Sequence, residues 1–481
     1  GINNQPNKVR GQRIYHWYGH YPELPPMDML DEMAEYGCSI LILHMPSFKW
    51  IDGSQPINEF NFRAVVDSAH NLGIKMMFYI QPILISQSSK KHKQLERCLN
   101  DNGKLCWHSL KDTQIVFYVP NSDYDCDELC LRCEDAYNYI KDSVLGCYGK
   151  YGFDGLYIDF AWPSIAVCTD SEHGHRPGLF NFYDYHRMMR EFRDAIGPEG
   201  IMIGHGGSLL VSSDYAEGFD ACLTGEGQKD LLPDVIGVQT GAVPTLWTMH
   251  RRKERQFRSR KAMSSLIREG VTPHIGQGII GKSILATMDP AHTPHFLALW
   301  QIWRAFPVEK ATFYNYLSES VIELDNDEIT YCMYSAPENQ VLIIICNEGG
   351  PESESAVSVG VNLSLDINKL DLTARMHRWN LRGTTYENFR ITSGDDVVNG
   401  KIRVPEIGID GFIGIILTDG KPPKELIELG KHLDGRPERL PEIYRNKIRR
   451  LKETDKILDE FNKLDLSSMT EEEFMNNRVM E

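Results

Sequence analysis

Eight short apolar segments, each separated from the next by a stretch with helical spacing, fill roughly the first 300 residues of the chain. A nearly continuous apolar run such as CSILILH at 38–44 is typical of a parallel sheet covered on both faces. Strands that alternate with helices in this way predict an α/β protein built on a (β/α)8 TIM barrel. The expected strands are 12–17, 38–44, 74–80, 153–158, 200–205, 219–224, 243–249 and 271–275.

Helices are expected between most of these strands, because apolar residues recur there at helical intervals and Gly or Pro marks several ends. One connection, from about residue 83 to 135, is too long for an ordinary loop, and its length indicates a functional excursion with a strand at 115–119. The expected helices span 27–33, 60–72, 128–145, 182–196, 260–268 and 295–305.

The pattern changes to alternating strands from residue 318, which predicts a small antiparallel β-sandwich. A charged helical tail follows. We expect this tail to pack back on the body or to mediate a homo-oligomer, with a solvated amphipathic helix of no specific role as the alternative. The expected domains are the barrel at 1–317, the sandwich at 318–420 and the tail at 421–481.

The charge and hydropathy of the sequence argue against some classes of binding partner. The formal net charge of -16 argues against nucleic acid or an anionic membrane surface as the main partner, since both need a basic footprint. No apolar run approaches the roughly 20 residues needed to span a bilayer. The polar start and the glycine at position 1 indicate a processed terminus. Localisation is open, with the periplasm or the cell exterior favoured if a signal peptide was removed.

One expected strand, FDGLYI at 153–158, ends on a carboxylate, Asp159. Burial of an unpaired carboxylate among apolar residues costs several kcal/mol, so the local structure alone gives little reason for an Asp at this position. In a parallel barrel the C-terminal ends of the strands carry the catalytic side chains. Asp159 is therefore the leading candidate for a catalytic residue, with a structural carboxylate at the rim as the alternative.

The other strand ends bring imidazoles, amides and aromatic rings to the same mouth. Any one of them could be a satisfied polar group, but together they suit a sugar, whose ring faces stack on aromatics and whose hydroxyls bind His, Gln and Asp. The candidate substrate-binding residues at these ends are His16, His20, His44, Tyr79, Gln81, Trp162, His205, Trp247, His250 and Gln277.

A second carboxylate, Glu226, follows the sixth strand in a Gly-Glu-Gly turn. Glycoside hydrolysis needs one carboxylate that attacks or stabilises the anomeric carbon and one acid that protonates the leaving oxygen. Desolvation and the nearby Asp159 charge would raise the pKa of Glu226 as an acid requires. Asp214 and Glu217 are competitors, whereas Asp220 starts the strand at the wrong end.

An Asp at the tip of the fourth strand and an acid after the sixth resemble the retaining α-glycosidase clans. These include the α-galactosidases, the α-N-acetylgalactosaminidases and the endo-α-N-acetylgalactosaminidase-like barrels. The segment Asp154-Gly-Leu-Tyr-Ile-Asp159 also resembles a group of uncharacterised bacterial barrel hydrolases. The resemblance implies Asp159 as nucleophile, Glu226 as acid/base, and an exo-acting enzyme for α-linked galacto-type sugars. The α-galactosidases carry an Asp-containing turn where this chain has Gly-Glu-Gly, so the sugar and the anomeric configuration stay open.

The loop after the fourth strand is rich in polar residues. Arg176 could hold an acidic sugar through its planar fork, or form a structural ion pair. Cys168, His173 and His175 suggest zinc, but no complete ligand set is evident, and buried thiols or a disulfide are the alternative. Cys126, Cys130 and Cys133 raise the same question at an expected helix start. We therefore predict no metal.

No Gly-x-Ser-x-Gly elbow and no dinucleotide-binding glycine motif occur, so neither a serine hydrolase nor a nucleotide cofactor is predicted. The sequence thus favours a glycoside hydrolase without a cofactor, acting on an oligosaccharide or polysaccharide. Two alternatives stay open: a non-catalytic carbohydrate-binding protein, and a polysaccharide lyase with His205 or His250 as the base.

Overall fold

The structure of the chain is a computed structural model. It describes residues 5–17, 24–44, 47–48, 55–56, 58–87, 89–100, 126–159, 167–168, 170–180, 182–205, 218–226, 243–247, 267–268, 270–276, 293–315, 318, 320–327, 329–347, 359–407 and 411–461.

Eight parallel strands form a closed ring in which each strand is hydrogen-bonded to two neighbours. The order around the ring is β1, β2, β3, β6, β9, β10, β11, β12 and back to β1. All eight correspond to the apolar segments predicted from the sequence. Their bounds are β1 Ile14–Trp17, β2 Ile40–Leu43, β3 Lys75–Ile80, β6 Gly155–Ile158, β9 Ile201–His205, β10 Ala221–Glu226, β11 Val243–Trp247 and β12 Thr272–Gly276.

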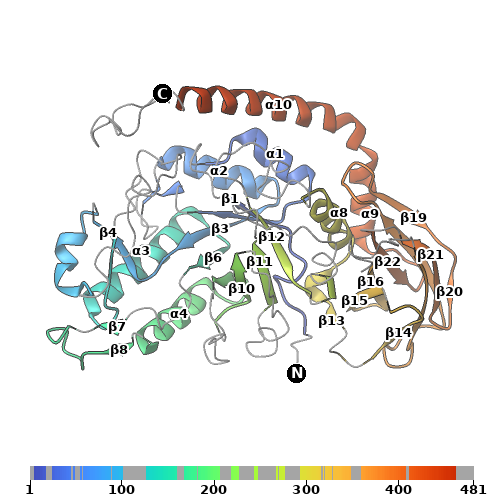
Figure 1. The fold of residues 1–481 in the computed structure, drawn as a ribbon, viewed down its shortest axis with the longest axis horizontal. Helices are drawn as coiled ribbons and strands as arrows, with labels where there is room; N and C mark the ends of the chain where they lie inside the picture. Colours follow the sequence, from blue (N-terminus) through green and yellow to red (C-terminus); the bar gives the residue numbers. More distant parts are fainter. Residues whose placement is uncertain are drawn as a thin grey trace.

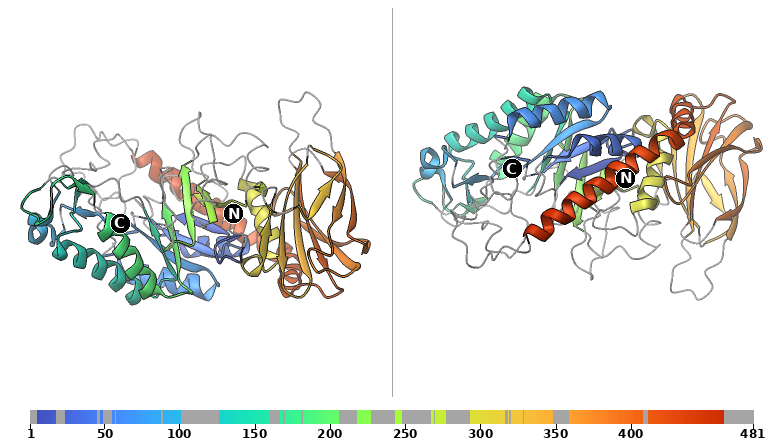
Figure 2. Two further views of the ribbon diagram at one scale, coloured as in Figure 1. Left: turned by 90° about the horizontal axis from the view of Figure 1, so that it is seen from below. Right: turned by 90° about the horizontal axis from the view of Figure 1, so that it is seen from above.

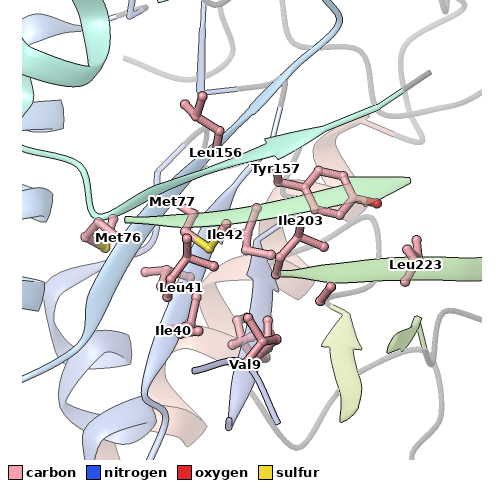
Figure 3. Close-up of a cluster of buried hydrophobic side chains, with 14 of the residues drawn as sticks. Val9, Ile40, Leu41, Ile42, Met76, Met77, Leu156, Tyr157, Ile203 and Leu223 are labelled. Carbon is pink, nitrogen blue, oxygen red and sulfur yellow. The ribbon is translucent and has the colours of Figure 1, made fainter. Parts of the chain in front are cut away.

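The strands are buried on both faces, which explains their continuous apolar sequences. Every residue of β1, β2 and β6 is buried. Side chains such as Leu41, Met77 and Ile203 belong to one hydrophobic cluster with side chains from the surrounding helices (Figure 3). Burial of this cluster supplies the main driving force for closing the ring.

In the described part of the chain, five of the eight strands of the ring are followed by a helix (Figure 1). The side chain of Asn58 caps the start of α2 by accepting a hydrogen bond from the backbone of Asn61 at 3.1 Å. The helices that follow β1, β2, β3, β6 and β12 are α1 Met27–Glu35, α2 Glu59–Asn71, α3 Glu134–Tyr151, α4 Phe182–Ile196 and α8 Thr293–Arg304. The expected helix at 260–268 lies mostly outside the described residues, so the complete (β/α)8 alternation stays a prediction.

The long connection after β3 contains a two-stranded antiparallel sheet, β4 (Leu84–Ser86) with β5 (Cys126–Glu128), and the 3-10 helix η2 (His92–Cys98). The strand expected at 115–119 lies outside the described residues. The helix expected at 128–145 begins only at Glu134. Residues 126–133 instead form a strand and a turn, because Cys130 and Cys133 close a backbone hydrogen bond ahead of the helix.

An antiparallel sheet of ten strands follows the barrel. We predicted a sandwich of two separate sheets, but in the structure β18 belongs to both halves of one continuous strand order, the half that contains β22 and the half that contains β20. Arg375 and Met376 pair with β20, while residues 377–382 pair with β22. A second hydrophobic cluster contains side chains from both halves, among them Ile343 and Leu363. The strands are β13 Thr312–Tyr314, β14 Ile322–Leu324, β15 Ile329–Ala336, β16 Gln340–Asn347, β17 Val359–Leu365, β18 Arg375–Arg382, β19 Arg390–Ser393, β20 Val397–Val398, β21 Lys401–Ile407 and β22 Phe412–Thr418.

The charged tail forms two helices, α9 (Lys424–Asp434) and α10 (Arg436–Phe461), and α10 lies across the outside of the barrel (Figures 1 and 2). Arg450 of α10 forms a buried ion pair with Glu32 of α1. The tail therefore packs back on the barrel, as one of its predicted roles required. Among the described residues, no helix combines the length and apolar character needed to cross a membrane.

Candidate functional site

Asp159 directly follows β6 at the C-terminal end of the ring. Its Oδ1 lies 2.9 Å from Nδ1 of His205, and its Oδ2 accepts hydrogen bonds from the Tyr79 hydroxyl and, at 3.1 Å, from Nε2 of Gln81. The side chain remains 14% exposed. Tyr79 and Gln81 come from β3 and the residue after it, and His205 ends β9. Both strands are the hydrogen-bonded neighbours of β6, so the ring order itself brings these donors to the carboxylate.

The charge of Asp159 is set by two opposed effects. Burial alone would raise the pKa of the carboxyl group, but the electrostatic interaction with His205 and the hydrogen bonds from His205, Tyr79 and Gln81 outweigh burial. The net result lowers the pKa of Asp159 to about 2. Asp159 is therefore a carboxylate, not a carboxylic acid, at any physiological pH.

Below Asp159, rings from several strands pack together in the barrel interior. The ring of His44 lies 3.8 Å from that of Tyr79, and His16 lies 4.9 Å from Tyr157, measured between ring centroids. His274 of β12 lies 6.2 Å from His16. These contacts form a floor of aromatic and imidazole rings under the carboxylate.

The floor carries little charge. His16 and His274 are fully buried. Burial, followed by the neighbouring imidazoles, lowers the pKa of His16 well below its usual range. Burial, and then His205, lowers the pKa of His274 to about 3. Two neutral imidazoles therefore underlie one anionic carboxylate.

Glu226 is the last residue of β10, and its Cα is in register with Trp247 of β11. The register shifts between Leu223 and Glu226, which marks an irregularity at the end of the strand. Leu223 is aligned with His205, so the backbone of Glu226 extends three residues beyond the level of His205. The side chains of Glu226 and Trp247 lie outside the described part of the chain. The separation of the two predicted catalytic carboxylates therefore stays a prediction.

Asp220 occupies the opposite end of the barrel, as its place at the start of the strand indicates. Its Oδ2 lies 2.6 Å from Nη2 of Arg193 and accepts a hydrogen bond from the backbone of Met202 at 2.8 Å. The competitors Asp214 and Glu217 lie outside the described residues.

The remaining candidates divide into three groups. The structure brings together His16, His44, Tyr79, Gln81 and His205 around Asp159. Arg176 is exposed in the loop between β7 (Val167–Cys168) and β8 (Leu179–Phe180). The residues outside the described part of the chain are His20, Trp162, His250 and Gln277.

Tyr157 belongs to the floor but was not among the predicted site residues. Its ring lies 5.7 Å from Tyr79 and 6.2 Å from His205. The sequence held a signal for it, because side chains two apart on a strand share a face and Tyr157 precedes Asp159 by two. Its fully apolar context made it resemble a core residue.

The arrangement suits a polar ligand that needs an anion above a buried layer of rings. An ionised carboxylate can attack or stabilise an electron-poor carbon, or hold an imidazole in one orientation. Among the described residues, a group of side chains spaced like metal ligands lies elsewhere. It comes from the loop between β7 and β8 and from the turn before α3.

Comparison with known proteins gives a match to one family model, described as a domain of unknown function (DUF6259), over residues 51–246. A search of curated proteins finds no match. Solved structures share the fold at low identity. A maltogenic α-amylase from Thermotoga neapolitana is 12% identical with a TM-score of 0.53, over 85% of this chain and 99% of that one. A debranching enzyme from Nostoc punctiforme is 13% identical with a TM-score of 0.53, over 87% and 100%.

An α-galactosidase of family GH36 from Geobacillus stearothermophilus is 13% identical with a TM-score of 0.51. This match covers 86% of the present chain and 56% of the galactosidase. These three similarities concern the fold alone, and they are consistent with a barrel followed by a β-rich part.

Proposed function

We propose that this protein is a glycoside hydrolase in which Asp159 is the nucleophile and Glu226 the general acid/base. The observation that carries the proposal is a mostly buried carboxylate, kept ionised by three side-chain donors, at the C-terminal end of a parallel ring. This is the end of such barrels where catalytic side chains gather. The shared fold with amylases, a debranching enzyme and an α-galactosidase is consistent with the proposal.

A nucleophile must be ionised before it can attack the anomeric carbon. The lowered pKa of Asp159 meets this requirement at any pH at which the protein works. An oxocarbenium-like transition state would then lie beside the carboxylate, whose negative charge stabilises it. The rings of Tyr79 and Tyr157 are themselves buried, so they support the carboxylate from below without competing for this charge.

The acid/base role of Glu226 rests on its position at the end of β10, two strands around the ring from Asp159. A retaining enzyme requires the two carboxyl groups to be about 5–5.5 Å apart, and an inverting enzyme about 6.5–9.5 Å. We propose retention and exo action on an α-linked galacto-type sugar, on the strength of the sequence resemblance.

The test is a screen of α- and β-aryl glycosides with wild-type protein and Asp159→Asn. Wild type should release the aryl group from at least one glycoside, and Asp159→Asn should show no turnover above background. Asp154→Asn is the matched control, because Asp154 lies at the other end of β6 and binds His70 and the backbone of Met76. Equal turnover by Asp159→Asn and wild type would refute the nucleophile.

Glu226→Gln separates acid catalysis from other roles. Loss of a general acid should slow substrates with poor leaving groups by about 10²–10⁴-fold and spare activated ones. Equal losses on both would assign Glu226 another role. A mechanism-based inhibitor followed by mass spectrometry should place the covalent label on Asp159. Binding of oligosaccharides without release of reducing ends would favour a carbohydrate-binding protein instead.

One observation favours a second candidate, a polysaccharide lyase. The 2.9 Å contact between Asp159 and Nδ1 of His205 is the arrangement by which a carboxylate orients a histidine base. A lyase would form an unsaturated product that absorbs in the ultraviolet, whereas a hydrolase would form new reducing ends without that absorbance.

A further inference from the structure

Two cysteines and two histidines converge away from the mouth of the barrel. The ligand atoms of Cys130, Cys168, His173 and His175 all lie within 4.8 Å of one another. Sγ of Cys130 lies 3.3 Å from Nε2 of His175, and Sγ of Cys168 lies 3.1 Å from Nδ1 of His173. In a tetrahedral zinc site, bonds of about 2.0–2.3 Å put neighbouring ligand atoms roughly 3.3–3.8 Å apart. The observed contacts are close to this spacing.

Both histidines are held by their other ring nitrogen. Nε2 of His173 lies 3.4 Å from Oδ2 of Asp170, and Nδ1 of His175 lies 3.0 Å from the carbonyl oxygen of Arg176. Histidines that bind metals almost always give their second nitrogen to a carboxylate or a carbonyl in this way. Each contact leaves the nitrogen nearest to a cysteine sulfur to act as the ligand.

The chain places these residues by local structure. Cys168 ends β7, and its carbonyl accepts a hydrogen bond from Gly178 at 2.8 Å, which closes the loop that carries both histidines. Gly174, between the histidines, adopts a left-handed φ of +71°, a conformation that glycine adopts readily. Cys130 comes from the turn before α3, more than thirty residues earlier in the chain.

From this geometry we infer a structural zinc site with Cys130, Cys168, His173 and His175 as its four ligands. Two thiolates neutralise a divalent zinc ion, which suits a position where both cysteines are fully buried. A tetrahedral set of two sulfurs and two nitrogens is typical of zinc. Four protein ligands leave no open coordination position, so the site is structural and not catalytic.

One of the four residues, His173, also borders a hollow of about 730 Å³. The lining of this hollow includes both acidic and basic side chains, among them Asp170, Glu172, Arg97 and Arg132. Zinc would tie the loop between β7 and β8 to the turn before α3.

The test is the metal content of the intact chain, purified without metal-affinity resins or chelators from cells supplied with zinc. Elemental analysis should find about one zinc per chain in wild type and less than about 0.1 in Cys168→Ser and His173→Asn. The control is Cys147→Ala, which removes a buried thiol of α3 outside the ligand set and should keep its zinc. Cobalt in place of zinc should give the visible bands of a tetrahedral thiolate site.

A positioning variant keeps the inference testable if the ligand variants fail to fold. Asp170→Asn preserves all four ligands and should weaken zinc binding by about 10–100-fold in competition with a chelator. Wild type without zinc, wild type with iron or copper in its place, or a disulfide between Cys130 and Cys168 would each overturn the site. So would Asp170→Asn with unchanged affinity. None of these readouts depends on turnover, so the zinc site and the hydrolase proposal can fail separately.

Discussion

The charge of Asp159 gives a prediction that needs no substrate. A carboxyl group whose pKa is lower in the folded state than in the unfolded state stabilises the fold above its unfolded pKa. This contribution disappears as the pH falls through the folded pKa. For Asp159 the ordinary value is 3.8 and the folded value about 2. At about 1.4 kcal/mol per unit, the carboxylate contributes about 2 kcal/mol near neutral pH.

Integration over the titration gives the size of the pH effect. Between pH 5 and pH 3 the Asp159 contribution should fall by about 1 kcal/mol, and the rest should disappear by about pH 1. The assay is urea unfolding of wild type and Asp159→Asn at several pH values in this range, followed by fluorescence. The difference in unfolding free energy between the two proteins should shrink by about 1 kcal/mol from pH 5 to pH 3.

A variant that keeps the charge provides the control. Tyr79→Phe retains the carboxylate but removes one donor, and a hydrogen bond to a charged group contributes about 1.5–3 kcal/mol. Its unfolding free energy should therefore change less with pH than that of wild type over the same range. A difference between wild type and Asp159→Asn that stays constant from pH 5 to pH 3 would refute the lowered pKa.

Two further predictions concern the fold. Gly155→Ala should destabilise the barrel by about 1–3 kcal/mol, since a Cβ there would lie 2.3 Å from the backbone oxygen of Ile201, whereas Gly149→Ala, with nothing within 4 Å, should stabilise slightly in thermal unfolding. Arg450→Ala should cost about 3–5 kcal/mol in urea unfolding, because it removes the guanidinium group that pairs with the fully buried carboxylate of Glu32. An unchanged midpoint for either destabilising variant would contradict its argument.

Much of the fold could be predicted from the sequence, because the strands and helices depend on the local pattern of apolar residues. The eight strands follow from apolar runs, and α4 has the predicted bounds, Phe182–Ile196. The division into domains ending at residues 317 and 420 stays a prediction. The pairing of β18 with two different strands could not be predicted, because it depends on contacts between segments distant in the chain.

The site was predictable as a set of strand ends but not as a set of contacts. The period of a strand put Tyr79 and Gln81 on one face, yet nothing local showed that both donate to Asp159. Cys168, His173 and His175 stood out as a possible zinc set in the sequence. Cys130 could not be recognised as the fourth member, because the fold of the long connection after β3 brings it to them. The expectation of no metal arose from this missing partner.

Asp159 differs from two other carboxylates of the barrel in the source of the hydrogen bonds that its side chain accepts. Asp154 and Asp220 lie at the starts of barrel strands, and each accepts a hydrogen bond from the backbone of a neighbouring strand, at Met76 and Met202. They thereby complete the pairing of the sheet. The hydrogen bonds described for the carboxylate group of Asp159 come from the side chains of His205, Tyr79 and Gln81, in or next to the two strands that flank β6. Such donors stabilise the charge without adding to the strand ladder. A ligand that needs a negative charge at this end of the ring would account for a buried carboxylate held by side chains in this way.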